Sequence, residues 1–155
     1  MNDIFYLPFD QIDALELIPV LNESSVRNHL VTHPRFDAAN IFQWVESKRE
    51  CDRLPGCCSR VIVMGGKPIG WCGIQPDADD FELAMVLSRA CWGIGPSVFR
   101  TLCAWAGELG HSSVMIHLLE TRPEYRFLAR KAVAVGHRTM LGRRFNSYRI
   151  AVACK

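Results

Sequence analysis

A glycine-rich turn near the middle of the chain constrains the fold more than any other segment. The turn covers residues 88–97 and reads Ser-Arg-Ala-Cys-Trp-Gly-Ile-Gly-Pro-Ser, and the apolar run 81–87 precedes it. Pro96 stands where the first residue of a helix is expected, and Gly110 follows its last apolar position. One face of this helix would carry Val98, Leu102, Trp105 and Leu109. The sequence therefore predicts a strand, a turn and an amphipathic helix in direct succession.

Two more apolar runs precede this unit. Residues 61–64 and 69–74 flank the turn Gly-Gly-Lys-Pro at 65–68. A second polar turn at 75–80 leads into the run 81–87. Connections this short join antiparallel neighbours in a sheet. We therefore expect an antiparallel meander of three strands.

The amino-terminal third predicts one strand followed by short helices. Residues 3–9 are apolar and aromatic enough for a first strand. Because Pro19 cannot lie inside one continuous helix, segment 15–30 divides into two short helical pieces. Asp37 is a candidate N-cap for a later helix. The apolar side of that helix would carry Ile41, Phe42, Trp44 and Val45.

The carboxy-terminal third alternates between strand and helix. Residues 114–119 form another apolar run. Thr121 and Glu124 have capping-box spacing for a further helix. The segments 137–140 and 147–152 are predicted to be a closing pair of strands. The whole pattern indicates an α/β (α+β) fold.

Length and composition favour one soluble domain spanning residues 1–155. Of the 155 residues, 49% are hydrophobic and 22% charged, which is ordinary for a domain that buries a core without disulfides. The net charge of +2 gives no reason to expect a nucleic-acid partner. No apolar run approaches the roughly 18 residues that cross a bilayer, and the amino terminus does not resemble a signal peptide. We therefore expect a cytoplasmic protein that binds neither membrane nor nucleic acid.

The seven cysteines are many for such a chain, and their number is odd. Because no Cys-x-x-Cys pair is present, their spacing does not indicate zinc, and we expect no bound metal. Free cysteines in a reducing compartment behave as small buried hydrophobes. Cys72 and Cys91 could also be acyl-accepting nucleophiles, but the sequence offers them no positioned histidine partner. Core packing is therefore the prediction for both.

The turn at 88–97 is a candidate phosphate site. A glycine-rich turn at a helix start leaves backbone N–H groups free beside the positive end of the helix dipole. A dinucleotide fingerprint is disfavoured because Val98 stands where its third glycine belongs, and no Walker loop is present. The structural alternative is that Gly93 and Gly95 only make a tight turn.

Residues 81–110 resemble the acetyl-CoA motif of the GNAT superfamily, which is a strand, a Q/R-x-x-G-x-G/A turn and a long helix. The stretch from Leu21 to Leu30, together with Trp44 and the pair Trp92-Gly93, is similar to the branch that contains ribosomal-protein N-terminal and spermidine acetyltransferases. The resemblance covers most of the chain from about Leu17 onward. It implies a mixed, mostly antiparallel central sheet flanked by about four helices, with a splayed strand pair at the cofactor site.

The resemblance also implies how acetyl-CoA would bind. Its diphosphate would lie against backbone N–H groups of the turn, with Ser97 nearby, and its pantetheine would follow the strand edge where 85–87 splays from 114–118. Ala90 occupies the Q/R place of the motif, so Arg89 would supply the cation, and Pro96 has no N–H to donate. The implied cofactor-binding residues are Met85, Val86, Leu87, Arg89, Trp92, Gly93, Ile94, Gly95 and Ser97.

Acetyl transfer requires a base for the amine and an acid for the leaving thiolate. Glu82 is the candidate base, because it is a lone carboxylate in an apolar strand at the family's place for a glutamate that acts through water. The alternative is that Glu82 simply faces solvent. The family's tyrosine acid would fall on Ala129, and Tyr125, one helical turn earlier, could substitute. The segment 132–136 is longer than the usual link in the family.

His117 lies in the predicted splayed strand. It would either approach the thioester or amine or serve as a hydrogen-bonded structural residue. The acceptor cleft would be lined by residues 33–42 and 145–148.

The predicted function is N-acetyl transfer from acetyl-CoA to a primary amine by direct attack, and the acceptor is a protein N-terminus or a small molecule. A homodimer is left open. The rival from another class is a non-catalytic acyl-CoA-binding regulatory module. A toxin that acetylates aminoacyl-tRNA is disfavoured, because a tRNA-binding face should be basic.

Overall fold

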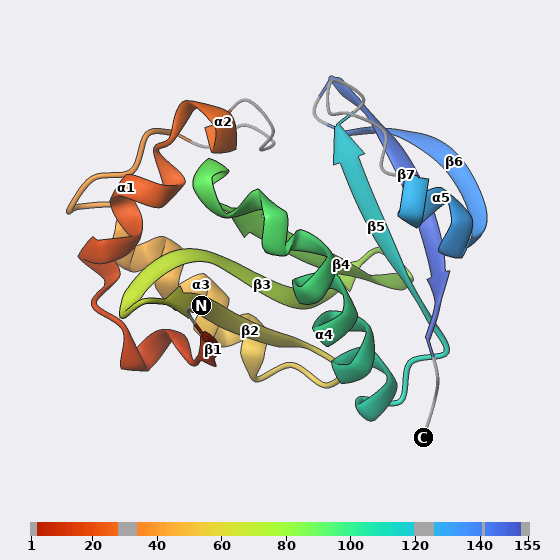
Figure 1. Ribbon diagram of the computed structural model, residues 1–155, viewed down its shortest axis with the longest axis horizontal. Helices are drawn as coiled ribbons and strands as arrows, with labels where there is room; N and C mark the ends of the chain where they lie inside the picture. Colours follow the sequence, from red (N-terminus) through yellow and green to blue (C-terminus); the bar gives the residue numbers. More distant parts are fainter. Residues whose placement is uncertain (1–2, 28–33, 120–125, 141, 153–155) are drawn as a thin grey trace.

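A computed structural model describes residues 3–27, 34–119, 126–140 and 142–152. Within these ranges one seven-stranded sheet has the order β1-β2-β3-β4-β5-β7-β6 (Figure 1). Neighbouring strands are antiparallel except β4 and β5, which are parallel. The predicted α/β (α+β) class with a mostly antiparallel sheet is confirmed. The strands are β1 (Ile4–Leu7), β2 (Cys58–Met64), β3 (Lys67–Asp77), β4 (Asp80–Leu87), β5 (Ser113–Leu119), β6 (Ala132–Met140) and β7 (Arg143–Ala151).

The predicted meander is present as β2, β3 and β4, but its second turn is shorter than expected. The strand β3 continues to Asp77, so that Gln75 pairs with Glu82 and Pro76 pairs with Phe81 of β4. The reversal is confined to the two residues after Asp77, and Ala78 adopts a left-handed conformation with φ of 52°. This extension of the hairpin brings Gln75 directly opposite Glu82.

The β4–β5 pair is splayed, as the family resemblance implies. Glu82 and Met115 are the only register pair between these two strands in the part of the chain that the structure describes. Figure 1 shows the carboxyl ends of the two strands pointing away from each other. The sheet is therefore almost divided between β4 and β5.

Short helices precede the longer helices α3 and α4. Pro19 lies in the first turn of α1, so the predicted helix break is confirmed. Asn40, rather than Asp37, is the N-cap of α3. The Asp37 carboxylate accepts from the N–H groups of Ala39 and Asn40 and so stabilises the turn before the helix. The helices are η1 (Phe9–Gln11), η2 (Ala14–Leu17), α1 (Ile18–Leu21), α2 (Ser24–Arg27), α3 (Ile41–Asp52), η3 (Arg89–Ile94), α4 (Gly95–Glu108) and α5 (Arg126–Lys131), of which η1–η3 are 3₁₀ helices.

Two apolar clusters cover the two faces of the sheet. One lies between the sheet and α4, and the other lies between the sheet, α3 and the early helices. Leu83 and Leu87 of β4 belong to the first cluster, whereas Ala84 and Val86 pack against the second. Side chains alternate along a strand, so Glu82 points to the face that α3 covers.

Two predicted apolar positions are wrong. Phe42 is 55% exposed and Leu109 is 42% exposed. Phe42 follows Ile41, whose side chain is fully buried, and neighbouring residues on a helix point in different directions. Leu109 is the C-cap of α4, beyond the part of the helix that contacts the sheet.

The carboxy-terminal hairpin starts earlier than predicted. Residues 132–136 form the first half of β6 rather than a link, because β7 pairs with them. Thr121, Glu124 and Tyr125 lie outside the described residues. None of the helices in the described ranges is long and apolar enough to span a membrane.

Candidate active site

Glu82 lies at the junction where β4 and β5 begin to separate. It is opposite Gln75 of β3 and opposite Met115 of β5. Its carboxylate Oε1 accepts a hydrogen bond of 2.7 Å from Gln75 Nε2. The side chain is 22% exposed. Glu82 is thus held by one bond and still reachable from solvent, which differs from the freely solvated alternative.

His117 approaches Glu82 from β5. Its side chain is 2% exposed, and Nε2 lies 2.7 Å from Asp77 Oδ2 and 3.9 Å from Glu82 Oε2. Nδ1 lies 2.7 Å from Ser147 Oγ. A carboxylate can only accept a hydrogen bond, so His117 Nε2 carries a hydrogen and donates it to Asp77 Oδ2 in this bond. His117 is therefore a hydrogen-bonded residue that also faces the candidate base.

Asp77 connects this site to β6 through Arg138. Arg138 Nη1 donates a 2.6 Å hydrogen bond to Asp77 Oδ1, and Asp77 is 11% exposed. A charge-assisted hydrogen bond of this length offsets the negative charge of the carboxylate. The arginine thus neutralises the Asp77 carboxylate, the charge nearest His117.

A second ion pair lies at the closed end of the splayed strands. Arg149 of β7 donates two hydrogen bonds of 3.1 Å to the two oxygens of Asp80, and one of 3.1 Å to Ser113 Oγ. The Arg149 guanidinium lowers the pKa of the Asp80 carboxyl below its ordinary value. The pair joins the β3–β4 turn to β7 beside the Glu82–Met115 junction.

Lys48 extends the site onto α3. Its Nζ donates a 3.3 Å hydrogen bond to Gln75 Oε1 and lies 4.2 Å from the ring centroid of Trp71. Burial lowers the pKa of the Lys48 ammonium, while nearby Cys51 and Glu82 act in the opposite direction. We use the name polar cluster for the connected side chains Lys48, Gln75, Asp77, Glu82, His117, Arg138 and Ser147.

Three members of the polar cluster have the chemistry of metal ligands. The ligand atoms of Asp77, Glu82 and His117 lie within 4.8 Å of one another. However, His117 Nε2 and Asp77 are already hydrogen-bonded, and the Arg138 charge lies beside Asp77. The arrangement is thus satisfied by the protein's own groups, and it fits a proton-handling site better than a cation site.

The glycine turn folds as η3 followed directly by α4. Cys91 N–H donates to the Ser88 carbonyl at 2.8 Å, and Gly95 N–H donates to the Trp92 carbonyl. Pro96 has no N–H, so helix geometry leaves the Ser97 N–H as the first-turn donor without a partner inside α4. The turn therefore offers fewer donors than an open loop would.

Side chains attach the turn to its surroundings. Trp92 Nε1 donates to the Leu87 carbonyl at 3.1 Å, which holds the turn against the end of β4. The exposed Arg89 guanidinium lies 5.8 Å from the Trp92 ring centroid, and its backbone N–H donates to Glu23 Oε1. A Cβ added to Gly93 would meet nothing within 4 Å, so packing does not require glycine there.

The predicted pantetheine edge lies beside the turn. Met85 and Val86 are half-buried on opposite faces of β4, and Leu87 is buried in the first apolar cluster. Gly70 of β3 lies directly against this segment, and a Cβ there would overlap the Val86 carbonyl oxygen. The structure thus brings Met85, Val86 and Leu87 together with the turn, whereas Glu82 lies at the other end of β4.

Cys72 and Cys91 both pack against the first apolar cluster, as predicted. Cys72 is fully buried, and burial raises the pKa of its thiol. Burial also raises the pKa of Cys103 to about 11. Cys91 packs, half-buried, against the first apolar cluster. The raised pKa values make the Cys72 and Cys103 thiols poor nucleophiles.

Local sequence patterns do not indicate most of the polar cluster. Gln75 is predicted to lie in a turn, but β3 continues to Asp77 and the chain reverses at residues 78 and 79, which places Gln75 opposite Glu82. Lys48 and Arg138 lie on elements distant in sequence and carried no local pattern. Glu23, which accepts from Ser88 Oγ at 2.7 Å, was also missed for that reason.

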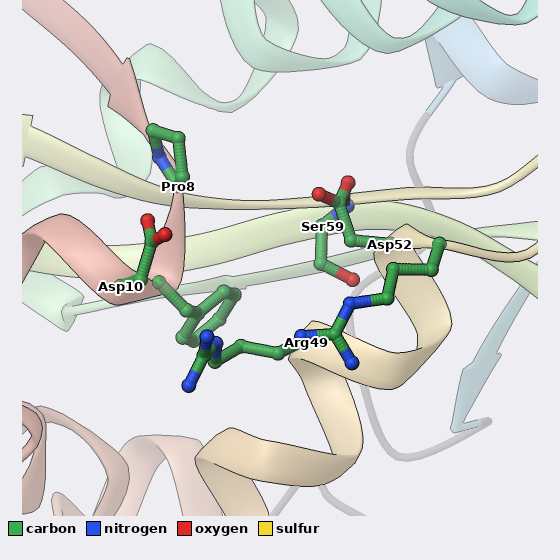
Figure 2. A pocket seen from close by; sticks show the side chains of 7 residues that line it. Pro8, Asp10, Arg49, Asp52 and Ser59 are labelled. Atoms are coloured by element: carbon green, nitrogen blue, oxygen red, sulfur yellow. Dashed lines mark hydrogen bonds between the residues drawn. The ribbon is translucent and has the colours of Figure 1, made fainter.

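A shallow pocket lies apart from the polar cluster, between η1, α3 and β2 (Figure 2). Asp52 lies beside Ser59 there, accepts from its N–H at 2.9 Å and pairs with Arg60 at 2.6 Å. The pocket residues belong to none of β4, β5 and η3, so this pocket is not part of the candidate site. It is lined by Pro8, Phe9, Asp10, Arg49, Asp52, Arg53 and Ser59.

Solved structures provide the decisive comparison. No protein-family model matches the chain. No curated protein matches it in sequence either. In contrast, the microcin C7 self-immunity acetyltransferase, solved with acetyl-CoA and AMP, superposes with a TM-score of 0.77 at 14% identity, over 97% of this chain and 93% of that one. The chain has the GNAT fold.

Two further structures agree with this assignment of the fold. A probable acetyltransferase of the GNAT family from Chromobacterium violaceum has a TM-score of 0.73 at 15% identity, covering 96% of this chain and 87% of its own. An N-acetyltransferase from Staphylococcus aureus has a TM-score of 0.70 at 12% identity, covering 97% and 98%. At these identities the likeness is one of GNAT fold, and the activity must be argued from the site.

Proposed function

We propose that this chain is an acetyl-CoA-dependent N-acetyltransferase that transfers an acetyl group to a primary amine by direct attack. The observation that carries the proposal is the position of Glu82, a partly exposed carboxylate at the point where the parallel strands β4 and β5 separate. The GNAT fold and a solved neighbour that binds acetyl-CoA support the same reaction class.

Glu82 is the proposed base. Gln75 occupies Oε1, whereas Oε2 lies 3.9 Å from the nearest nitrogen of His117, beyond hydrogen-bond distance. Oε2 can therefore accept a proton from the attacking amine, directly or through a water molecule. Nitrogen then bonds to the acetyl carbon, the carbon–sulfur bond breaks, and the thiolate takes up a proton.

The surrounding residues hold this carboxylate in place. Gln75 is itself bonded to Lys48, and His117 is fixed between Ser147 and Asp77. Such hydrogen bonds orient the reacting group before the reaction begins, so no further entropy is lost to orient it during the reaction. Tyr125 remains the proposed acid for the thiolate.

The cofactor is proposed to bind along the splayed edge. Its pantetheine would follow Met85, Val86 and Leu87, and its diphosphate would lie at the turn from Trp92 through Ile94 to Gly95. The Gly95 N–H is already bonded to the Trp92 carbonyl. We therefore propose that the Ser97 donors and the exposed Arg89 make most of the hydrogen bonds to the diphosphate.

The acceptor is proposed to be a protein N-terminus or a small-molecule amine, as in the branch that contains ribosomal-protein N-terminal and spermidine acetyltransferases. The reaction would take place in the cytoplasm. The polar cluster contains two carboxylates and two basic side chains, Lys48 and Arg138, so it does not favour a polycation.

Calorimetry with CoA and acetyl transfer to a panel of amines test the proposal, with wild type compared with Glu82→Gln. We expect CoA binding by both proteins and transfer by wild type alone. If CoA binds but wild type acetylates none of the amines, the chain is instead an acyl-CoA-binding module. If CoA fails to bind at millimolar concentration, the enzyme assignment is wrong.

A further inference from the structure

Lys48 differs from the other described lysines. Lys67 and Lys131 are exposed, whereas Lys48 is half-buried and belongs to the polar cluster. The chain has only one more lysine, Lys155, which lies outside the described residues. Lys48 is thus the one lysine amine in the described part of the chain that reaches the candidate active site.

The side chain of Gln75 connects the Lys48 amine to the proposed base Glu82. Nζ lies 3.3 Å from Gln75 Oε1, and Gln75 Nε2 lies 2.7 Å from Glu82 Oε1. The Nζ atom also lies beside two rings, 4.2 Å from the Trp71 centroid and 5.4 Å from that of Trp44. Rotation about the four-carbon stem of lysine is enough to move Nζ by the width of an amide group.

The charge state of Lys48 favours reaction. No carboxylate among the described residues lies within ion-pair distance of Nζ, and the cation is held by rings and a neutral amide. Burial lowers the pKa of Lys48, so a larger fraction of this amine is neutral at a given pH than for an exposed lysine. Only the neutral amine attacks a thioester.

We propose that Lys48 is a self-acetylation site, modified by the same molecule that binds acetyl-CoA. The inference rests on the proposed function and adds an internal acceptor to it. The Lys48 nitrogen bonds to the acetyl carbon as the carbon–sulfur bond of acetyl-CoA breaks. One proton leaves nitrogen for Glu82 and one is taken up by sulfur, so the products are Nε-acetyl-lysine and CoA thiol.

The test is peptide mass spectrometry of the purified chain after incubation with acetyl-CoA. We expect Lys48 to be acetylated at least about tenfold faster than Lys67 or Lys131, because its amine is already held beside the reacting group. The rate per molecule should not depend on protein concentration, since the transfer is intramolecular. Excess CoA should suppress acetylation at Lys48 and leave Lys67 unaffected.

Two variants separate self-acetylation from chemical reactivity. Glu82→Gln, checked for folding by circular dichroism, should lose Lys48 acetylation while retaining the background at Lys67. A mixture of Glu82→Gln with Lys48→Arg, the latter first shown to acetylate an added amine, supplies an intact Lys48 on one molecule and a working base on the other. It should give no acetyl-Lys48, because the transfer occurs within one chain.

The inference and the proposed function fail in different ways. If wild type binds CoA and acetylates an added amine but leaves Lys48 unmodified, self-acetylation is overturned and the enzyme assignment stands. Equal acetylation of Lys48 and Lys67, unchanged in Glu82→Gln, also overturns self-acetylation. If calorimetry detects no CoA binding, both proposals are overturned.

Discussion

The turn at 88–97 and the polar cluster are built from different parts of the chain. The turn is one continuous segment whose backbone donors would bind a ligand, and Glu23 is the long-range side chain that caps its start. The polar cluster draws side chains from α3 and from β3, β4, β5, β6 and β7. The turn is a local structure whose backbone donors do not depend on particular side chains. The polar cluster depends on tertiary structure.

The difference separates the proposed cofactor site from the proposed chemistry. A backbone site needs only a strand, a turn and a helix start, which many sequences provide. A side-chain site changes whenever one of its distant contributors changes. We therefore expect variants of the two regions to affect different measurements.

Glu82→Gln should have the largest effect. Without a base the amine keeps its proton, so kcat for acetyl transfer should fall by about 10²–10³. The affinity for CoA should stay within twofold, roughly, since the turn is untouched. Steady-state kinetics and calorimetry measure the two quantities, and Glu108→Gln at the exposed end of α4 is the matched control. A parallel loss of CoA affinity would show that the two regions are not separate.

Gly70→Ala should destabilise the pairing of β3 with β4, the strand to which the turn is attached. The new Cβ overlaps the Val86 carbonyl, so β3 and β4 must move apart. We expect a loss of about 1–3 kcal/mol in the free energy of unfolding, measured by urea denaturation. Unchanged stability would mean that β4 can shift at this point, and the predicted pantetheine edge would then be adjustable rather than fixed.

Gly93→Ala should act on the turn alone. A methyl group meets nothing within 4 Å, so stability should change little. The same methyl group would stand between the backbone and a bound diphosphate, and CoA affinity should fall about tenfold, or about 1.4 kcal/mol. Calorimetry measures it, with Gly136→Ala as the control, since that position is equally open and lies on β6. Identical affinities for both variants would place the diphosphate elsewhere.

Asp80→Asn should have the smallest effect, and one that depends on pH. Arg149 lowers the pKa of folded Asp80, so its contribution to stability is present above the unfolded pKa of about 4 and is lost as the pH falls through the folded pKa. The difference in Tm between wild type and Asp80→Asn should therefore be positive near neutral pH and shrink at acidic pH. A difference that stays constant across this range would assign the effect of the substitution to something other than the ion pair.

Local patterns predicted most of the fold. The turn, the start of α4 (Gly95, one residue before the predicted Pro96) and the meander all follow from proline, glycine and alternation within short windows. Phe42 and Leu109 were misassigned because helical periodicity says which residues share a face but not how far the neighbouring element extends. The position of Glu82 could be predicted, since it depends on a single strand and the family resemblance.

The partners of Glu82 could not be predicted in the same way. Arg138 and Asp77 are 61 residues apart, and their strands, β6 and β3, are not neighbours in the sheet. His117 reaches Asp77 across 40 residues. A single sequence does not reveal either pair, because no fixed separation along the chain identifies the contact. The arrangement of the strands sets it.

The single Glu82–Met115 register pair has a mechanical consequence. The carboxy-terminal block from β5 onward is joined to the rest of the sheet along a weak seam, reinforced beside the pair by Arg149 and Asp80. Opening along this seam costs fewer main-chain hydrogen bonds than opening between any other neighbouring strands of the described sheet. Any molecule that lies across the seam bridges the two blocks, and resistance to heat should rise with its concentration.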